Sequence, residues 1–439
     1  MKKLEILTDP NPILREEARA VDIFDGQFQA LVDDMVFTMR SSNGIGLAAS
    51  QVGAIKQIIV AEYEEEEDND SFPLKVIVNP KIEKVSDEQI FLAEGCLSFP
   101  GKELYIKRPQ EIEISALDRW GKPIKIKSDG LLARVIEHEI DHLSGVLMID
   151  HIRPVRTVFI GSGTLGVPAL EIISDNPQFS LSAVITGSDR PAGRDKILTP
   201  TIIAESAERL KMKVLKIDSI KDRKAIEKIK SLEPELIVLA DFGQKISEEI
   251  INLPKFGILN IHPSLLPKYR GPSPVVSAIL AGEKKTGVSI IRINSEIDAG
   301  DILAQIEVKI GSRETAEKLK NRLANFGADL LAEVVPYMIA GEITPIKQNP
   351  NLASATKIFD KSSGKLSSNE SSAEVDRMVR AFSPWPGVYT TRNDKRIFIT
   401  AAHLDRQKKL IIDSVKPEGK REMRYSEYLA GNQPLTFGE

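Results

Sequence analysis

The chain has 439 residues, of which 42% are hydrophobic and 28% are charged, and its formal net charge is −4. Since a domain usually takes about 100–200 residues, this length predicts several domains and excludes a single small module. The composition excludes wholesale disorder, and no apolar run approaches the roughly 20 residues that a membrane helix needs. The N-terminal segment lacks the apolar stretch of a secretory signal, so we expect a cytoplasmic protein.

Charge is distributed unevenly along the chain. Residues 1–154 contain 18 Lys and Arg against 28 Asp and Glu, a net charge of −10, whereas residues 155–439 contain 41 against 35, a net charge of +6. We therefore expect any nucleic-acid contact in the basic half, with ordinary scatter as the alternative. The chain has one cysteine, Cys96, so it forms no internal disulfide.

The first 154 residues have the pattern of strands followed by a helix. Apolar side chains at helical spacing predict a helix with one buried face, made of Phe28, Leu31, Val32, Met35, Val36 and Met39. Short β-like runs predict strands at 57–61, 74–79 and 111–117, and a helix is expected at about 131–143. This order indicates an α+β domain over residues 1–154.

Strands alternate with helices after Pro154. The predicted strands cover 156–160, 182–186, 235–240 and 257–261. Such alternation indicates an α/β, Rossmann-like domain with a mostly parallel sheet, which we assign to residues 155–345.

The last part of the chain differs in composition. Residues 346–366 are rich in Asn, Ser, Lys and Pro, which predicts a linker. Two β-like runs follow at 396–401 and 409–414, and they indicate a small, shortened β-rich module of OB-like type over residues 367–439.

The pentapeptide HEIDH at 138–142 carries the first chemical signal. On a helix, His138 and His142 lie one turn apart on the same face, where both imidazoles can bind one metal ion. Glu139 between them is placed as a general base would be. A catalytic metal site needs a third ligand, for which Cys96 is the natural candidate; the alternative is that this cysteine is a small buried hydrophobe.

Three segments occur together in this half: GIGLAASQ at 44–51, EGCLS at 94–98, and HEIDH. With these motifs, residues 1 to about 153 resemble the peptide deformylase family, whose members remove the formyl group from N-formylmethionyl nascent peptides. The resemblance implies that Cys96, His138 and His142 bind a divalent metal ion, Fe²⁺ in the family and Zn²⁺ or Ni²⁺ as other occupants. It also implies that Glu139 is the general base.

The same resemblance assigns the oxyanion donors to the side-chain amide of Gln51 and the backbone N–H of Leu97. Gly46 is expected to let a strand approach the peptide substrate, with a plain turn glycine as the alternative. Arg108 is expected to pair with Asp141 and brace the metal-binding helix. A zinc metalloprotease is the alternative for this half, although no further ligand follows at the spacing of that class. The family's C-terminal tail is missing, since the next domain begins after Pro154.

The hexapeptide GSGTLG at 161–166 matches the dinucleotide-binding pattern, since it follows a predicted strand and opens a helix. The acidic residue expected about 20 positions later, at the end of the next strand, is missing. We therefore expect a tight strand-to-helix turn beside a substrate crevice rather than an NAD site.

A second chemical signal lies in NIHPSLLPKYRG at 260–271, followed by DAGD at 298–301. Asn260 and His262 are two positions apart on a predicted strand, so their side chains point to the same side. Together with DRPAGR at 189–194 and RAFSPWPG at 380–387, these segments resemble the methionyl-tRNA formyltransferases among the folate-dependent formyltransferases. The resemblance runs from about Val155 to Gly387.

This second resemblance implies transfer of a formyl group from 10-formyltetrahydrofolate to the amine of methionyl initiator tRNA. It implies a catalytic group in which His262 and Asn260 hold an oxyanion and Asp298 steers proton transfer. The implied folate contacts are Phe242, Gly243, Ser264, Leu265, Leu266 and Pro267, and the implied tRNA contact is Arg194. Asp241 stands where the family has a small neutral residue, so we expect weaker folate binding.

The sequence therefore predicts a bifunctional hydrolase and transferase of translation initiation, with no contact to DNA or membranes. An alternative is an active deformylase whose second half serves as a module that binds tRNA or the ribosome. A further alternative is that the two halves are joined only by gene prediction.

Overall fold

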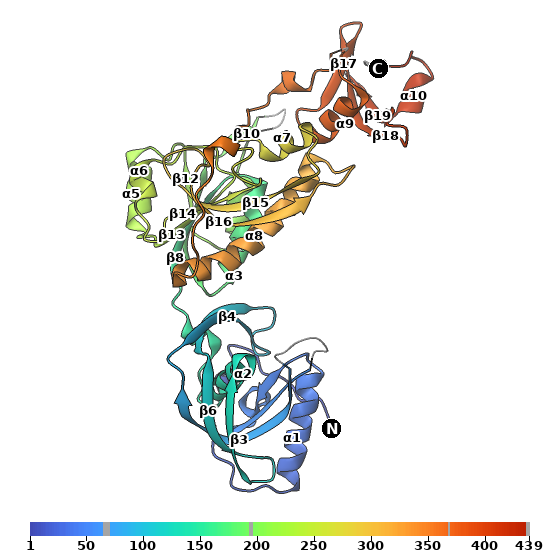
Figure 1. The fold of residues 1–439 in the computed structure, drawn as a ribbon. Helices are drawn as coiled ribbons and strands as arrows, with labels where there is room; N and C mark the ends of the chain where they lie inside the picture. The colour runs from blue at the N-terminus through green and yellow to red at the C-terminus, as the bar shows by residue number, and fades with distance from the viewer. Residues whose placement is uncertain (65–70, 193–195, 368, 436–439) are drawn as a thin grey trace. The chain divides into compact units, whose positions relative to one another are not determined.

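The computed structural model describes residues 1–64, 71–192, 196–367 and 369–435. The chain separates into two compact units, Met1–Pro154 and Val155–Glu439 (Figure 1).

An antiparallel sheet with the strand order β1-β2-β3-β6-β7 forms the centre of the first unit, and β4 and β5 form a separate antiparallel pair. The strands are β1 (Gly46–Ala48), β2 (Ile58–Tyr63), β3 (Phe72–Val85), β4 (Gln89–Gly95), β5 (Glu103–Pro109), β6 (Glu111–Leu117) and β7 (Pro123–Asp129). The helices are α1 (Gly26–Arg40) and α2 (Gly130–Leu143), with 3₁₀ turns η1 (Pro12–Arg15), η2 (Ala49–Val52) and η3 (Met148–His151).

The two faces of this sheet are covered by different helices. In β2, Ile58 and Val60 pack with α1, whereas Ile59 between them packs in the cluster that contains α2. This alternation follows from the two-residue period of a strand. Asp25 begins α1 by accepting hydrogen bonds from the backbone N–H groups of Gln27 and Phe28. Burial of each large apolar side chain of α1 contributes about 1.5–3 kcal/mol.

The second unit is built on a sheet with the strand order β12-β9-β8-β13-β14-β15-β16. The first five strands in this order, β12, β9, β8, β13 and β14, are parallel to one another. β15 and β16 are antiparallel to their neighbours. The bounds are β8 (Val155–Gly161), β9 (Phe179–Gly187), β12 (Val214–Ile217), β13 (Leu236–Ala240), β14 (Ile258–His262), β15 (Lys285–Arg292) and β16 (Ile302–Lys309), with the small pair β10 (Arg190–Ala192) and β11 (Ile197–Thr199).

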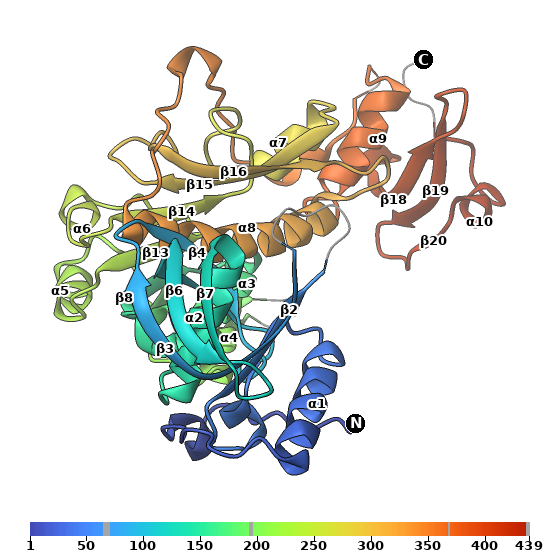
Figure 2. The ribbon, with the colours of Figure 1, turned by 60° about the horizontal axis from the view of Figure 1, so that its bottom comes forward.

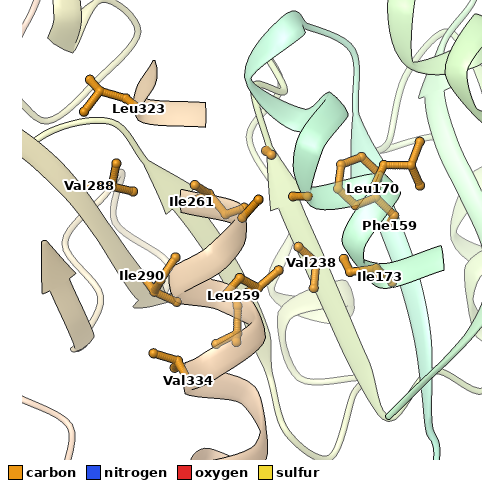
Figure 3. Packing of buried hydrophobic residues seen from close by; sticks show 14 of the residues in the cluster. Phe159, Leu170, Ile173, Val238, Leu259, Ile261, Val288, Ile290, Leu323 and Val334 are labelled. Carbon is orange, nitrogen blue, oxygen red and sulfur yellow. The ribbon is translucent and has the colours of Figure 1, made fainter. Parts of the chain in front are cut away.

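Helices cover both faces of this sheet. They are α3 (Val167–Asp175), preceded by the 3₁₀ turn η4 (Thr164–Gly166), α4 (Ile202–Arg209), α5 (Arg223–Ser231), α6 (Glu248–Ile251), α7 (Pro274–Leu280) and α8 (Ala316–Ala340). Phe159 and Val238 pack with α3 and α8 on one face, as Figure 3 shows, whereas Val158 and Ile237 pack with α5 on the other. Strands buried on both faces explain the continuous apolar runs in the sequence.

Helix α8 is long and apolar enough to cross a membrane by length and composition alone. Leu319, Leu323 and Leu331 of this helix are fully buried in the core of the second unit. The apolar character of α8 is therefore that of a core helix packed on the sheet.

The last part of the second unit is an antiparallel sheet with the order β17-β18-β19-β20. Its elements are η5 (Pro350–Leu352), η6 (Lys361–Gly364), α9 (Ser372–Ala381), β17 (Val388–Arg392), β18 (Lys395–Leu404), β19 (Leu410–Pro417), β20 (Met423–Arg424) and α10 (Tyr425–Leu429). Helix α9 lies against α7 (Figure 1, Figure 2), and Val276 and Leu280 of α7 pack on the core of this module.

These observations confirm the predicted fold class: an α+β first unit, a mostly parallel α/β sheet, and a small module of antiparallel strands. The strand predicted at 111–117 is β6. The sequence did not distinguish the antiparallel strand β15 from the parallel strands. β15 is buried along most of its length, and such a strand has the same apolar pattern in either direction.

A test of the α8 packing uses Gly327, which faces the sheet. A Cβ at this position would lie 2.6 Å from Cγ2 of Ile261. At an exposed helical position alanine is about 1 kcal/mol better than glycine, but overpacking a core costs about 1–3 kcal/mol. We expect Gly327→Ala to lower the melting temperature of the second unit, measured by calorimetry.

Asn325→Ala is the matched control, since Asn325 is exposed on the same helix. This variant should keep or raise the melting temperature. An equal rise in both variants would contradict the packing of α8 on β14.

Candidate active sites

The first candidate site forms where α2 meets the end of β4. His138 and His142, on α2, and Cys96, directly after β4, bring their ligand atoms within 4.8 Å of one another. Within the described part of the chain, these three side chains form a group that could hold a metal ion. The Cys96 Sγ lies 3.2 Å from His142 Nε2. One thiolate and two imidazoles are a donor set that divalent transition metals accept.

Glu94 orients one of these ligands. Its Oε2 lies 3.0 Å from Nδ1 of His138, which leaves the other ring nitrogen of His138 for a metal. Glu94 also accepts hydrogen bonds from Arg108 (2.6 and 3.0 Å) and Arg134 (2.5 Å). Although burial alone would raise it, hydrogen bonds from His138 and Arg108 lower the pKa of Glu94 to about 2. We did not predict this role from the sequence, although Glu94 lies in the EGCLS motif.

The expected pairing of Arg108 with Asp141 is confirmed, since Nη1 of Arg108 lies 2.8 Å from Oδ2 of Asp141. His151 extends this network, because its Nε2 lies 2.7 Å from the same carboxylate oxygen. The network therefore runs from His151, close to the end of the first unit, to the metal-ligand candidate His138.

Glu139 faces the interior beside Gly46. A Cβ on Gly46 would collide with the Glu139 carboxylate and with Val135. Gly46 is thus required for the close approach of β1 to Glu139. The expected approach of a peptide to Gly46 stays a prediction. Oε2 of Glu139 is buried without a hydrogen-bond partner among the described residues. Burial raises the pKa of Glu139 to about 7, against the lowering effect of the charge on His138.

The two expected oxyanion donors lie beside the Cys96 group. Gln51 is buried, its Oε1 accepts a hydrogen bond from the backbone N–H of Ala48, and its Nε2 lies 3.6 Å from Cys96 Sγ. Leu97 directly follows Cys96 in a turn, and its side chain lies against Gly44. The structure thus brings Gln51, Leu97, Glu139 and the three metal-ligand candidates together.

The second candidate site is a cavity of about 420 Å³ at the carboxyl ends of β13 and β14. Its wall includes Asn260 and His262 at the end of β14, and Asp298 from the loop after β15. This volume falls within the range of small-molecule sites. The position agrees with the rule that ligands of open α/β sheets bind at the carboxyl ends of the strands.

Asp298 joins the polar groups of this cavity. Its Oδ1 accepts a hydrogen bond from Nδ2 of Asn260 (3.2 Å), and its Oδ2 accepts one from the backbone N–H of Gly271 (2.8 Å). Oδ2 also lies 3.5 Å from Nδ1 of His262. The other ring nitrogen of His262 lies 2.9 Å from the carbonyl oxygen of Tyr269, so it carries a proton and donates.

The predicted cofactor contacts divide into two groups. Phe242 and Gly243 line the cavity. The segment 264–267 (Ser264, Leu265, Leu266 and Pro267) does not line the cavity, because it packs behind the cavity wall. Ser264 is fully buried, and the N–H of Leu266 donates to Oγ of Ser289. The Leu265 side chain lies against Gly287. Here this segment holds the loop after β14.

Asp241 stands at the rim of the cavity and pairs with Lys320 of α8, whose Nζ lies 2.7 Å from Oδ2 of Asp241. A Cβ on Gly163 would collide with this carboxylate, and the N–H groups of Ser162 and Gly163 donate to the carbonyl oxygen of Asp241. The glycine-rich turn thus accommodates the chain's own Asp241, which agrees with a turn beside a crevice. We did not predict a role for Lys320, which is distant from Asp241 along the chain. Arg194 lies outside the described residues.

Comparisons with known proteins agree with this division into two units. Residues 3–158 match the family model of polypeptide deformylases. Residues 155–335 match the formyl transferase model, and residues 359–411 match the model of the formyl transferase C-terminal domain.

Among individual relatives, the methionyl-tRNA formyltransferase of Bacillus cereus strain B4264 is 35% identical over 307 residues, covering 64% of this chain and 96% of the relative. That of Methylacidiphilum infernorum is 40% identical over 237 residues, covering 54% and 74%. A crystal structure of peptide deformylase from Ehrlichia chaffeensis has 41% identity, covers 35% of this chain and 89% of its own, and has a TM-score of 0.33.

The role of Glu94 can be tested by Glu94→Gln. Because an amide supports His138 less well than a carboxylate, we expect this variant to bind Zn²⁺ about 10–100-fold more weakly. Competition with a chromophoric chelator measures the affinity. Glu103→Gln, an exposed change in the neighbouring strand β5, should bind as the unmodified chain does. Equal affinities in all three proteins would contradict the orienting role.

Proposed function

Since this chain belongs to the methionyl-tRNA formyltransferase family and carries a polypeptide deformylase domain ahead of that region, we propose that it is a bifunctional enzyme of translation initiation. One reaction adds a formyl group to methionyl initiator tRNA, and the other removes it from N-formylmethionyl peptides. One observation carries this proposal: each unit gathers its own set of catalytic side chains around its own centre. We place both reactions in the cytoplasm.

For the hydrolysis, Glu139 accepts a proton from the attacking water and returns it to the leaving amine nitrogen. Its burial and its pKa of about 7 suit this exchange near neutral pH. The formyl carbon–nitrogen bond breaks, and formate and a free amine are released. Gln51, through its side-chain amide, and Leu97, through its backbone N–H, donate to the oxyanion that develops on the formyl group.

Cys96, His138 and His142 are proposed to hold a divalent metal ion. The orientation of His138 by Glu94 and the short distance from Cys96 to His142 support this assignment. When bound, the ion would lower the pKa of a water molecule and so supply a nucleophile at neutral pH. We propose Fe²⁺ as the ion, with Zn²⁺ and Ni²⁺ as others that the same donors accept.

For the transfer, the free amine of methionyl-tRNA attacks the formyl carbon of 10-formyltetrahydrofolate. A carbon–nitrogen bond to the methionyl amine forms, and the bond to the folate nitrogen breaks. Asn260, through its side-chain amide, and His262, through a protonated Nδ1, stabilise the oxyanion. Asp298 passes the proton from the attacking amine to the leaving nitrogen. Phe242 and Gly243 are proposed to contact the folate, and Arg194 the tRNA.

A second half that only tethers the first to tRNA or the ribosome is not favoured. A tether needs no catalytic side chains, yet Asn260, His262 and Asp298 lie in one cavity wall and two of them are hydrogen-bonded to each other. The pairing of Asp241 with Lys320 offsets the charge that led us to expect weaker folate binding.

Glu139→Ala tests the hydrolysis. Without the base, we expect formate release from N-formyl-Met peptides to fall about 10²–10⁴-fold. Metal content and formyl transfer by the same chain should stay unchanged and serve as controls for folding. Undiminished formate release from a metal-loaded variant would reject the role of Glu139.

His262→Ala tests the transfer. Because the variant lacks a donor to the oxyanion, we expect transfer of labelled formyl to methionyl-tRNA to fall about 10²–10³-fold. His403→Ala is a matched control, since His403 pairs with Asp413 in the C-terminal module. Transfer retained by His262→Ala would reject the proposed role, and loss in both variants would indicate a general folding defect.

A further inference from the structure

Residues 346–356, between α8 and the C-terminal module, run along the loops that carry the second site. We call this segment the strap. At one end Ile346 exchanges two backbone hydrogen bonds with Ile302, both 2.8 Å. At the other end the carbonyl oxygen of Ser354 accepts from the N–H of Arg270 (2.8 Å), and the N–H of Thr356 donates to the carbonyl oxygen of Arg270 (2.7 Å). The strap is therefore part of the folded second unit.

Gln348 is the side chain of the strap that reaches both catalytic loops. Its Nε2 donates to the carbonyl oxygens of Asp298 and Gly300, each at 2.8 Å. Its Oε1 accepts from Nε (3.0 Å) and Nη2 (2.7 Å) of Arg270. One amide thus uses both of its hydrogens on the loop of Asp298 and its oxygen on the loop that follows His262.

The backbone at these contacts needs external support. Asp298 and Tyr269 have φ angles of +49° and +62°, in the left-handed region that residues other than glycine hold only where their surroundings determine it. Gln348 binds the carbonyl oxygen of Asp298, and Oγ of Ser354 accepts from the N–H of Tyr269 at 2.9 Å. The strap thus supports both unusual conformations.

Both of these residues contact His262. The carbonyl oxygen of Tyr269 accepts from Nε2 of His262 at 2.9 Å, and Oδ2 of Asp298 lies 3.5 Å from its Nδ1. Movement of either loop would therefore change the position of His262, Asp298 or both. Gln348 itself is not part of the cavity wall.

We propose that Gln348 is a positioning residue for formyl transfer, which holds the Arg270 loop and the Asp298 loop at the separation that catalysis requires. This inference rests on the proposed transferase function. Since Gln348 acts on the geometry of the reacting groups and not on the substrates, its loss lowers kcat more than it raises KM. A displacement of about 1 Å in such groups can reduce the rate about 10²-fold.

Two variants separate the hydrogen bonds that Gln348 makes to Arg270 from those that it makes to the Asp298 loop. Gln348→Met keeps the approximate length of the side chain and loses every hydrogen bond. Gln348→Glu keeps the acceptor for Arg270 but replaces the donors to the carbonyl oxygens of Asp298 and Gly300. We expect kcat for transfer to methionyl-tRNA to fall about 10–100-fold in both, with KM for tRNA and for 10-formyltetrahydrofolate changed less than about 3-fold.

Asn351→Ala is the control on the strap, because Asn351 is exposed. It should keep full transfer. Formate release by the first unit of each variant serves as an internal measure of intact, correctly quantified chain. If Gln348→Met fails to fold, the kcat of Gln348→Glu alone tests the proposal, since this variant retains the contact to Arg270.

Unchanged kcat in the folded variants would overturn the proposal, as would a rise in KM at constant kcat, which would indicate substrate binding instead. Transfer that is normal in the unmodified chain and in Gln348→Met rejects only the role of Gln348. Transfer that is missing already from the unmodified chain rejects the proposed function and this role together.

Discussion

The carboxylate of Glu94 lies in the interior of the first unit, 6% exposed, where an unpartnered charge would cost several kcal/mol. Arg108, Arg134 and His138 satisfy it, and together they connect β4, β5 and α2. Cys96 follows β4 and His138 belongs to α2, so the alignment of the ligand candidates depends on this one buried group. Breaking such a charge cluster by removing one partner typically costs about 3–5 kcal/mol. The ion pairs and hydrogen bonds of Glu94 therefore contribute both to the folding stability of this unit and to the alignment of its metal-ligand candidates.

The second unit holds the polar groups of its candidate site by a different means. Asp298 is kept in place by neutral donors, the amide of Asn260 and the N–H of Gly271, and its backbone is held by Gln348. These groups lie on loops at the ends of buried parallel strands, which supply a rigid base but do not themselves set the loop conformation. A segment outside the sheet does this instead. The first site thus depends on charge pairing inside a core, and the second on hydrogen bonds between loops.

The sequence predicted elements and residue groupings where few residue types or one hydrophobic period fit. The spacing of His138 and His142 pointed to two side chains that the structure brings together with Cys96. The apolar period of α1 and the apolar runs of the parallel strands indicated those elements. Lys320 and Gln348 were missed because their partners are distant along the chain and their residue types are common on surfaces. The need for glycine at position 46 could not be predicted, because it depends on the position of Glu139 on another element.

Cys96 is the only thiol of the chain, and it stands among the metal-ligand candidates. A disulfide between two copies of this chain can therefore form only from Cys96 to Cys96, and such a bond would take the sulfur of both copies out of their sites. Under the proposed function, chains joined in this way would lack the thiolate ligand of the hydrolytic site. The second unit contains no cysteine, so thiol oxidation reaches the candidate site of the first unit and not that of the second.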